Sequence, residues 1–199
     1  MIRYAIESSK DFASRYVVVD KDGSTVPKIK ECRDERHLDV EIHVKPELNL
    51  VQSWDYGVQK IDEPWLLLQD GDEVFHTDGP ASIHNLRVLM DRPDVVYCAP
   101  MVLLWGDLKH TYSKCPIMPP HTFLYQNNGT IKPSKDPRKD HPVMKGWKIG
   151  LPIPYKFNCH IKHRARNRDV IPYDEQLFFP YPKILKKIII ARASSTSIR

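Results

Sequence analysis

The fold is decided by the stretch Glu63-Pro64-Trp65-Leu66-Leu67-Leu68-Gln69-Asp70-Gly71-Asp72-Glu73-Val74. Residues 65 to 68 are all apolar, and a run without alternation is typical of a central strand covered on both faces. This strand ends in two carboxylates separated by one glycine. In an open α/β sheet, ligands bind outside the carboxyl ends of the strands, so the turn is a place to hold a cation.

Asp70 and Asp72 could coordinate Mg²⁺ or Mn²⁺, directly or through water, because oxygen ligands suit these ions. Gly71 leaves room for a phosphate group to approach. An ordinary acidic turn after a strand would have the same composition, so this short motif needs further support.

Strand and helix patterns alternate on both sides of this stretch through the first hundred residues. Apolar residues recur at three- and four-residue steps where we expect helices, and β-branched runs mark the strands. A turn at residues 20 to 25 contains a Ser and a Thr that could cap the following helix. The expected elements are a helix within residues 2–13, a strand at 15–20, a helix after residue 25, a strand at 38–44, a helix at 50–61, the strand at 65–68, a helix at 83–90 and a strand within 94–104.

This alternation predicts an α/β fold with a mainly parallel open sheet and helices on both faces. The pattern changes after residue 104, because 11 of the 17 prolines lie beyond residue 100. Strand patterns at 108–112, 122–126 and 155–161 are joined there by long polar loops, which favours antiparallel strands. We expect one domain over residues 1–199, consisting of an α/β half (1–104), a loop-rich half (105–180) and a basic amphipathic helix with a tail (181–199).

The composition is that of a globular protein, with 41% hydrophobic and 28% charged residues in 199, which excludes disordered and fibrous classes. The net charge of +5 is unevenly distributed. Residues 1–100 contain 12 Lys or Arg and 19 Asp or Glu, a net charge of −7, whereas residues 101–199 contain 18 and 6, a net charge of +12. An acidic half joined to a basic half is unlike a uniform nucleic-acid-coating surface.

The four cysteines are Cys32, Cys98, Cys115 and Cys159, and none forms a CxxC pair. Their spacing indicates neither a zinc ribbon nor a thioredoxin-type site, so we expect buried thiols in a reducing compartment. The first residues are charged where a signal peptide needs an apolar core, and no apolar run reaches the about 18 residues of a membrane span. A cytoplasmic protein is therefore expected.

Two motifs occur in a fixed order, Val17-Val18-Val19-Asp20-Lys21-Asp22-Gly23-Ser24-Thr25 and the stretch from Trp65 to Glu73. Together they resemble the GT-A fold glycosyltransferases, most closely the broad family 2 of inverting enzymes. The resemblance implies that Asp70 and Asp72 hold Mn²⁺ or Mg²⁺ against the diphosphate of a nucleotide sugar. It also implies that Asp20 or Asp22 bonds the uracil or ribose, although turn formation alone would account for both residues.

The resemblance further implies a general base, since an inverting transfer must remove a proton from the acceptor hydroxyl. Relatives carry this base after a strand similar to residues 123–129, Phe-Leu-Tyr-Gln-Asn-Asn-Gly. Asp140 is the candidate in this chain and Asp136 is the second choice. A solvated loop of lysines and aspartates is the alternative for both residues.

A basic segment, residues 158–168, contains two histidines and three arginines. Many GT-A enzymes bring a late histidine to the metal, which suggests His160, with His163 as second choice. Arg164 and Arg166 would bind the diphosphate, because guanidinium groups contact phosphate oxygens bidentately. The segment could instead be a solvent-facing helix start or a patch for a nucleic-acid backbone.

The chain departs from the family at its beginning. The family opens with a strand that precedes the first helix and lines the base site, whereas here the pattern opens with the helix. The resemblance is strong to residue 75 and loose from there to about residue 170. It therefore implies a minimal or N-terminally shortened member.

The function expected from these observations is metal-dependent transfer of a sugar, from a nucleoside diphosphate sugar (UDP-linked on this reading) to a hydroxyl acceptor. The acceptor would be a glycan, a protein or a lipid-linked molecule. Residues 181–192 could pack on the core or lie at an anionic membrane surface, at the inner face of a membrane. The alternatives are a sugar nucleotidyltransferase, for which a Gly-rich loop is lacking, and a nucleic-acid-binding protein, for which no known binding motif is found.

Overall fold

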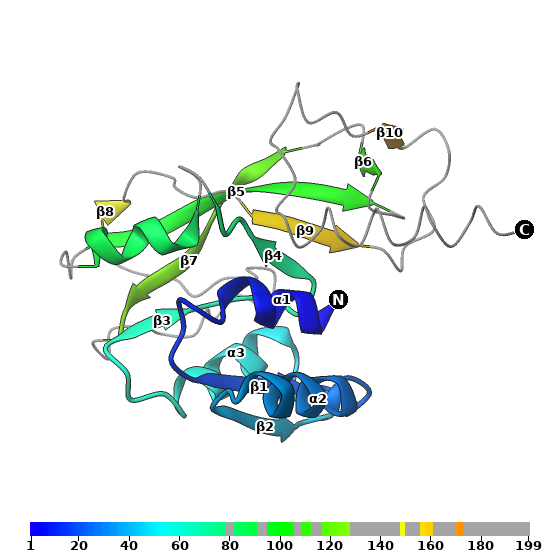
Figure 1. Cartoon of the computed structure of the whole chain (residues 1–199), viewed down its shortest axis with the longest axis vertical. Coiled ribbons are helices and arrows are strands. Elements are labelled where there is room, and N and C mark those ends of the chain that lie inside the picture. Colours follow the sequence, from blue (N-terminus) through cyan, green and yellow to red (C-terminus); the bar gives the residue numbers. More distant parts are fainter. Residues whose placement is uncertain are drawn as a thin grey trace, which may run out of the picture.

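The computed structural model describes residues 1–78, 82–90, 95–105, 109–112, 117–127, 148–149, 156–160 and 170–172. These residues form a mixed α/β structure (Figure 1), as the sequence predicts at this level. Its elements are α1 (Ile2–Ser9), β1 (Tyr16–Asp20), α2 (Val26–Arg36), β2 (Val40–Val44), α3 (Leu50–Val58), β3 (Trp65–Leu67), β4 (Glu73–Phe75), the 3₁₀ helix η1 (Ile83–Leu89), β5 (Val95–Trp105), β6 (His110–Tyr112), β7 (Ile117–Gln126), β8 (Lys148–Ile149), β9 (Lys156–His160) and β10 (Val170–Pro172).

A small parallel sheet is formed by β1 and β2, with Tyr16 opposite Val40 and Asp20 opposite Val44. Helix α2 connects the two strands, as a parallel pair requires a crossover. Thr25 occupies the N-cap position of α2, as the sequence predicts, but its side chain makes no capping hydrogen bond. The turn before α2 contains Gly23 at φ +75°, a conformation that glycine adopts without strain.

The larger sheet has eight strands, five of them in the order β10-β6-β5-β7-β3. Strand β9 lies parallel to β5 and antiparallel to β4, and β8 pairs parallel with β5. Five of the eight strand pairings among the described residues are antiparallel. Strands β3 and β4 pair antiparallel, so the parallel pairing predicted for the first half is wrong for these two strands. Strands β6 and β7 also pair antiparallel, as the sequence favours after residue 104. The reason is chain length, because only residues 106–109 and 113–116 separate β5, β6 and β7, too few for a crossover.

Strand β3 lies at the end of this strand order rather than at its centre. Its only strand neighbour in the described part of the chain is β7, with Leu66 opposite Tyr125. Leu66 is buried, whereas Trp65 and Leu67 are only half-buried. The expectation of a central strand is therefore wrong here, and the second edge of β3 faces a cavity described below. The short strands β4, β8 and β10 were not expected from the sequence.

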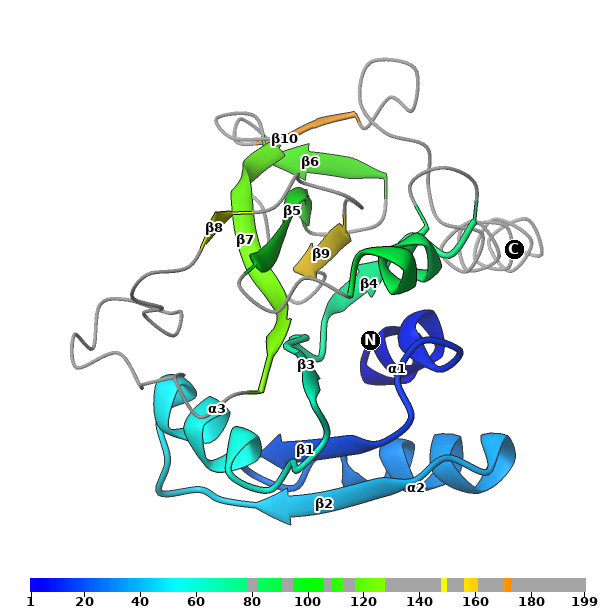
Figure 2. The same cartoon turned by 90° about the vertical axis from the view of Figure 1, so that its left-hand side faces the viewer.

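Helix α1 lies between the two sheets, against α2 on one side and β4 on the other (Figures 1 and 2). Ile6 packs against Ile29 and Cys32 of α2, both fully buried. Cys32 is thus a buried thiol, as expected, and burial raises the pKa of this thiol. A second core lies under the larger sheet, where Phe75 packs against Ile83 of η1.

The helical pattern at residues 83–90 is confirmed as η1, a 3₁₀ rather than an α-helix. No helix in the described ranges combines the length and apolar character needed to cross a bilayer. The expected helix at residues 181–192 and the tail to residue 199 lie outside the described residues.

Candidate functional site

A cavity of about 980 Å³ lies between the small sheet and the larger one. Residues of β1 and of β3 line it, with α1 contributing Ala5 and Ile6 and α3 contributing Gly57 and Val58. Figure 2 shows α1 and α3 at two sides of this region, with β1 below it. Most of the lining side chains are apolar, and polar groups line the cavity where β1 and β3 end.

The cavity is bordered by one edge of β1 and one edge of β3. Among the described strands, β1 pairs only with β2 and β3 pairs only with β7. Val17, Val18 and Val19 therefore remain half-buried although they form an apolar run. Helix α1 connects the two sheets beside this gap, since it contacts α2 on the side of the small sheet and β4 of the larger sheet.

Both sequence motifs reach this one cavity. Asp20 lies at the end of β1, and Asp70, Gly71 and Asp72 follow β3; all four residues line the cavity. Two carboxylate-bearing turns that are distant in the chain are thereby brought to the same space. This juxtaposition is the main result that the structure adds to the sequence pattern.

Asp20 and Asp22 have different surroundings. Asp20 lines the cavity, and its Oδ2 accepts hydrogen bonds from the backbone N–H (3.0 Å) and the hydroxyl (2.8 Å) of Thr25. Asp22 is not among the lining residues, and its Oδ1 accepts the backbone N–H of Ser24 at 2.9 Å. Asp20 thus closes the loop before α2 with one oxygen, and of the two residues it is the one beside the cavity.

Glu73 closes the turn that contains Asp70 and Asp72. Its side chain is buried, and Oε2 accepts the backbone N–H of Asp70 at 3.2 Å, while its own N–H donates to the carbonyl of Asp70 at 3.0 Å. Asp70 and Asp72 are half-buried and Gly71 is exposed. The fourth residue of the Asp-Gly-Asp-Glu motif is therefore structural, and the two aspartates are the residues that line the cavity.

The donor set suits a hard divalent cation that is shared with a ligand. The described residues contain no group of three or more His, Cys, Asp or Glu side chains arranged to hold a metal. Mg²⁺ is commonly bound through one or two carboxylates together with substrate phosphates rather than by a complete protein cage. Asp70 and Asp72 are the two carboxylates that could hold such an ion in this mode.

Three cationic side chains also line the cavity, namely Arg15, Lys21 and Lys28. Arg15 is paired with Glu41, with Nη2 2.6 Å from Oε2, and this hydrogen bond raises the pKa of Arg15. Lys28 is paired with Glu31 at 3.0 Å. The sequence reasoning missed Lys21, although a lysine between two aspartates of the first motif is a signal that could have identified it.

His160 is the last residue of β9, and only its backbone position is described. Strand β9 is antiparallel to β4 with Asn158 opposite Glu73, and parallel to β5 with His160 opposite Trp105. His160 therefore lies two residues beyond the partner of Glu73, in the direction from which the Asp70–Asp72 turn enters β4. The remaining predicted site residues, Asp136, Asp140, His163, Arg164 and Arg166, lie outside the described residues.

Comparison of the chain with models of known protein families and with curated proteins finds no match.

Proposed function

We propose that this protein is a metal-dependent glycosyltransferase with a GT-A-like fold. It would transfer a sugar from a nucleoside diphosphate sugar, UDP-linked on the motif resemblance, to a hydroxyl acceptor, with inversion at the anomeric carbon. One observation carries the proposal: the Asp20 end of β1 and the Asp70–Asp72 turn line the same cavity. Such a donor requires a site for the nucleoside at one end of the cavity and a site for the metal and the diphosphate at the other.

The residues have distinct tasks in this proposal. Asp70 and Asp72 hold Mn²⁺ or Mg²⁺, and the ion when bound offsets the charge that develops on the diphosphate. Asp20 contacts the base or ribose, and the Lys21 ammonium is available to a phosphate oxygen. His160 adds a ligand to the ion, with His163 as the alternative.

The transfer forms a bond between the acceptor oxygen and the anomeric carbon and breaks the bond from that carbon to the diphosphate. The electron pair of the broken bond leaves with the nucleoside diphosphate, and Arg164 and Arg166 stabilise that leaving group. Asp140, or Asp136 in its place, takes the proton of the acceptor hydroxyl.

The acceptor class follows from the C-terminal segment in this proposal. Residues 181–192 combine lysines with isoleucines, which suits contact with an anionic membrane at its cytoplasmic face and a lipid-linked acceptor. Flotation with anionic liposomes tests this part. Binding that is lost on deletion of residues 181–199 supports it, and absence of binding with the full chain contradicts it and leaves a glycan or protein acceptor.

Thermal unfolding in the presence of Mn²⁺ and UDP tests the central proposal. A ligand at 100 times its Kd stabilises the folded state by about 2.7 kcal/mol, which is readily measured as a rise in Tm. The wild type should show this rise, and Asp72→Ala should lose it. Asp34→Ala removes an exposed aspartate on α2, paired with Arg33, and should retain the rise. A wild type without any shift would remove the basis of the proposal.

A hydrolysis screen then separates the reaction classes. Metal-dependent release of free sugar from a nucleotide sugar supports a glycosyltransferase, because water can replace the acceptor. Release of pyrophosphate from a nucleoside triphosphate and a sugar phosphate would instead identify a nucleotidyltransferase. Binding to nucleic acid that is unaffected by Asp72→Ala and decreases steeply with salt would favour a nucleic-acid-binding protein.

A further inference from the structure

A cluster of two buried serines and one half-buried glutamine lies between α1 and the turn that contains Asp70 and Asp72. Its members are Ser8 and Ser9 of α1 and Gln69, which directly precedes Asp70. Ser8 is 1% exposed and Ser9 is 0% exposed. Buried polar side chains need hydrogen-bond partners. The partners found here lie on α1 and on the two sides of the turn, apart from the Tyr16 hydroxyl of β1, which is 3.3 Å from Ser9 Oγ.

The side-chain amide of Gln69 ties the two ends of the turn together. Its Nε2 donates to the carbonyl of Glu73 at 2.9 Å and to the carbonyl of Ala5 at 2.9 Å, and it lies 3.3 Å from Ser8 Oγ. Gln69 enters the turn and Glu73 leaves it. One amide group thus spans Asp70, Gly71 and Asp72 and holds both ends against α1.

Helix α1 completes the arrangement with its two serines. Ser9 Oγ donates to Gln69 Oε1 at 2.8 Å, which orients the amide so that Nε2 faces the two carbonyls. Ser8 Oγ accepts the backbone N–H of Phe75 at 3.1 Å and donates to the carbonyl of Ala5 at 2.7 Å. The strand after the turn is therefore bonded to the same helix as the residue before it.

The chemistry of this position requires an amide. A glutamate would place carboxylate oxygens where Nε2 now donates, beside two carbonyl oxygens, and methionine would fill the space without donating. In either case the carbonyls of Ala5 and Glu73 would lose a donor in a buried environment. Neither the metal nor the nucleotide contacts Gln69 in the proposed function, so its contribution would be made through the aspartates.

We propose that Gln69 is a positioning residue that fixes the separation and orientation of the Asp70 and Asp72 carboxylates for a divalent cation. This inference rests on the proposed function, since the cation belongs to it. Groups that orient metal ligands through hydrogen bonds typically contribute 10- to 100-fold to metal affinity. Gln69→Met, which is close in size, should therefore raise the Kd for Mn²⁺ about tenfold or more.

Mn²⁺ binding measured by electron paramagnetic resonance tests this. The signal intensity of unbound Mn²⁺ gives the Kd, and the spectrum of bound Mn²⁺ reports the symmetry of its ligands. Gln69→Met should change both. The control is Leu86→Ala, which removes a fully buried side chain of η1 and should lower the stability of the protein while Mn²⁺ affinity stays that of the wild type. Mn²⁺ affinity equal to wild type in a folded Gln69→Met protein would overturn the inference.

Hydrogen exchange of the backbone amides of Asp70, Glu73 and Phe75 gives a readout that needs no metal. Their exchange should accelerate in Gln69→Met relative to the amides of β5, and unchanged exchange would overturn the positioning role. If Gln69→Met does not fold, Ser9→Ala is measured in its place, because it removes the hydroxyl that donates to Gln69 Oε1. Failure of the wild type to bind Mn²⁺ with UDP would refute the proposed function, and the exchange comparison would still decide the role of Gln69.

Discussion

Asp20 serves the fold and the candidate site with the same carboxylate. One oxygen accepts two hydrogen bonds from Thr25 and closes the loop before α2, while the residue lines the cavity. Because the structural and ligand-binding roles coincide, loss of activity after mutation of Asp20 would not by itself identify a nucleotide contact. Stability and binding have to be measured on the same variants.

Asp20→Ala should lower the free energy of unfolding by about 1 to 3 kcal/mol, because the N–H and the hydroxyl of Thr25 lose their acceptor. Asp20→Asn keeps an acceptor oxygen for Thr25, so a smaller loss is expected. If Asp20 contacts the nucleotide through its charge, both variants should bind UDP more weakly. Urea denaturation together with UDP titration checks this, and an Ala variant as stable as the wild type would show that the loop does not depend on this carboxylate.

Gly71 provides a second test at the level of one residue. A Cβ atom at this position would lie 3.2 Å from Cδ1 of Ile2, the end of a flexible side chain, and the backbone φ is not in the left-handed region. Gly71→Ala should therefore change the free energy of unfolding by less than about 1 kcal/mol. A phosphate group that approaches Gly71 closely would be displaced, so UDP-Mn²⁺ should bind more weakly. Equal UDP-Mn²⁺ affinity in wild type and variant would show that the phosphate lies elsewhere.

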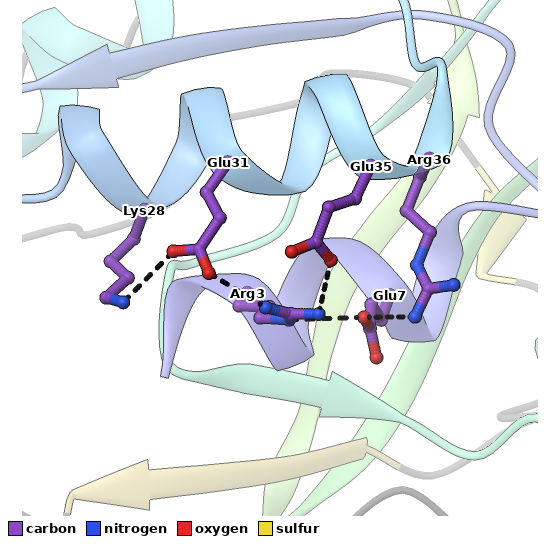
Figure 3. A network of polar contacts seen from close by, with 6 residues as sticks. All are labelled: Arg3, Glu7, Lys28, Glu31, Glu35 and Arg36. Atoms are coloured by element: carbon purple, nitrogen blue, oxygen red, sulfur yellow. Dashed lines mark hydrogen bonds and ion pairs between the residues drawn. The ribbon is translucent and has the colours of Figure 1, made fainter.

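At the level of elements, α1 is attached to α2 by a network of ion pairs (Figure 3). Arg3 is at its centre, with Nη2 2.6 Å from Glu35, Nη1 3.3 Å from Glu31 and Nε 3.4 Å from Glu7. Arg36 also reaches Glu7 at 3.0 Å. Since α1 also carries Ser8 and Ser9, the network orients the helix that is hydrogen-bonded to both sides of the Asp70–Asp72 turn.

Arg3→Met should lower the free energy of unfolding by about 1 kcal/mol or less, because exposed ion pairs contribute little individually. The effect should shrink at about 0.5 M salt, where exposed charges are screened. Lys30→Met removes an exposed charge of the same sign on α2 and should have a smaller effect that changes less with salt. Urea midpoints of the two variants at low and high salt check the comparison, and an equal salt response would argue against the network.

Acid should lower the stability that comes from ion pairs on α2 and β2. The hydrogen bond from Lys28 lowers the pKa of Glu31, and the hydrogen bond from Arg15 lowers the pKa of Glu41, both from an ordinary value of 4.5. The folded state therefore binds fewer protons than the unfolded state below pH 4.5. Stability from these groups is fully present above that pH and is lost as the pH falls through the lowered values. Lys28→Met should flatten the decline of the urea midpoint below pH 4.5, and a decline as steep as in the wild type would contradict this.

At the scale of the whole molecule, charge is separated along the chain. The half with a net charge of −7 contains the aspartates of the cavity, and the half with +12 contains the proposed diphosphate-binding arginines. The opposite charges are suited to a metal-bound nucleotide rather than to a long polyanion.

This separation predicts how ligand binding depends on salt. The affinity for UDP with Mn²⁺ should fall by only a few-fold between about 50 and 200 mM salt. A protein that neutralises several nucleic-acid phosphates would instead lose about 10³- to 10⁵-fold over that range. Titrations of UDP-Mn²⁺ and of a short DNA duplex in parallel check the expectation, and tight, strongly salt-dependent DNA binding would contradict it.

The order of helices and strands in the first half, and the residues of the two motifs, could be predicted from the amino-acid sequence. Apolar periodicity and glycine-containing turns are local properties, so β1, α2, β2, α3 and β3 were predicted close to their observed positions. The same local signals could not show that Glu73 closes a turn, or that Thr25 occupies a cap position without bonding through its side chain.

Strand pairing and the contacts between distant residues became known from the packing of the elements. Strand pairing is a non-local choice, set by connection length and by the faces that must be buried, and it made β3 an edge strand antiparallel to β7. It also brought Asp20 and Asp72 to one cavity and placed Gln69 against α1, although Ser9 and Gln69 are 60 residues apart. No pattern of period two or 3.6 encodes such contacts, because they depend on how separate elements pack.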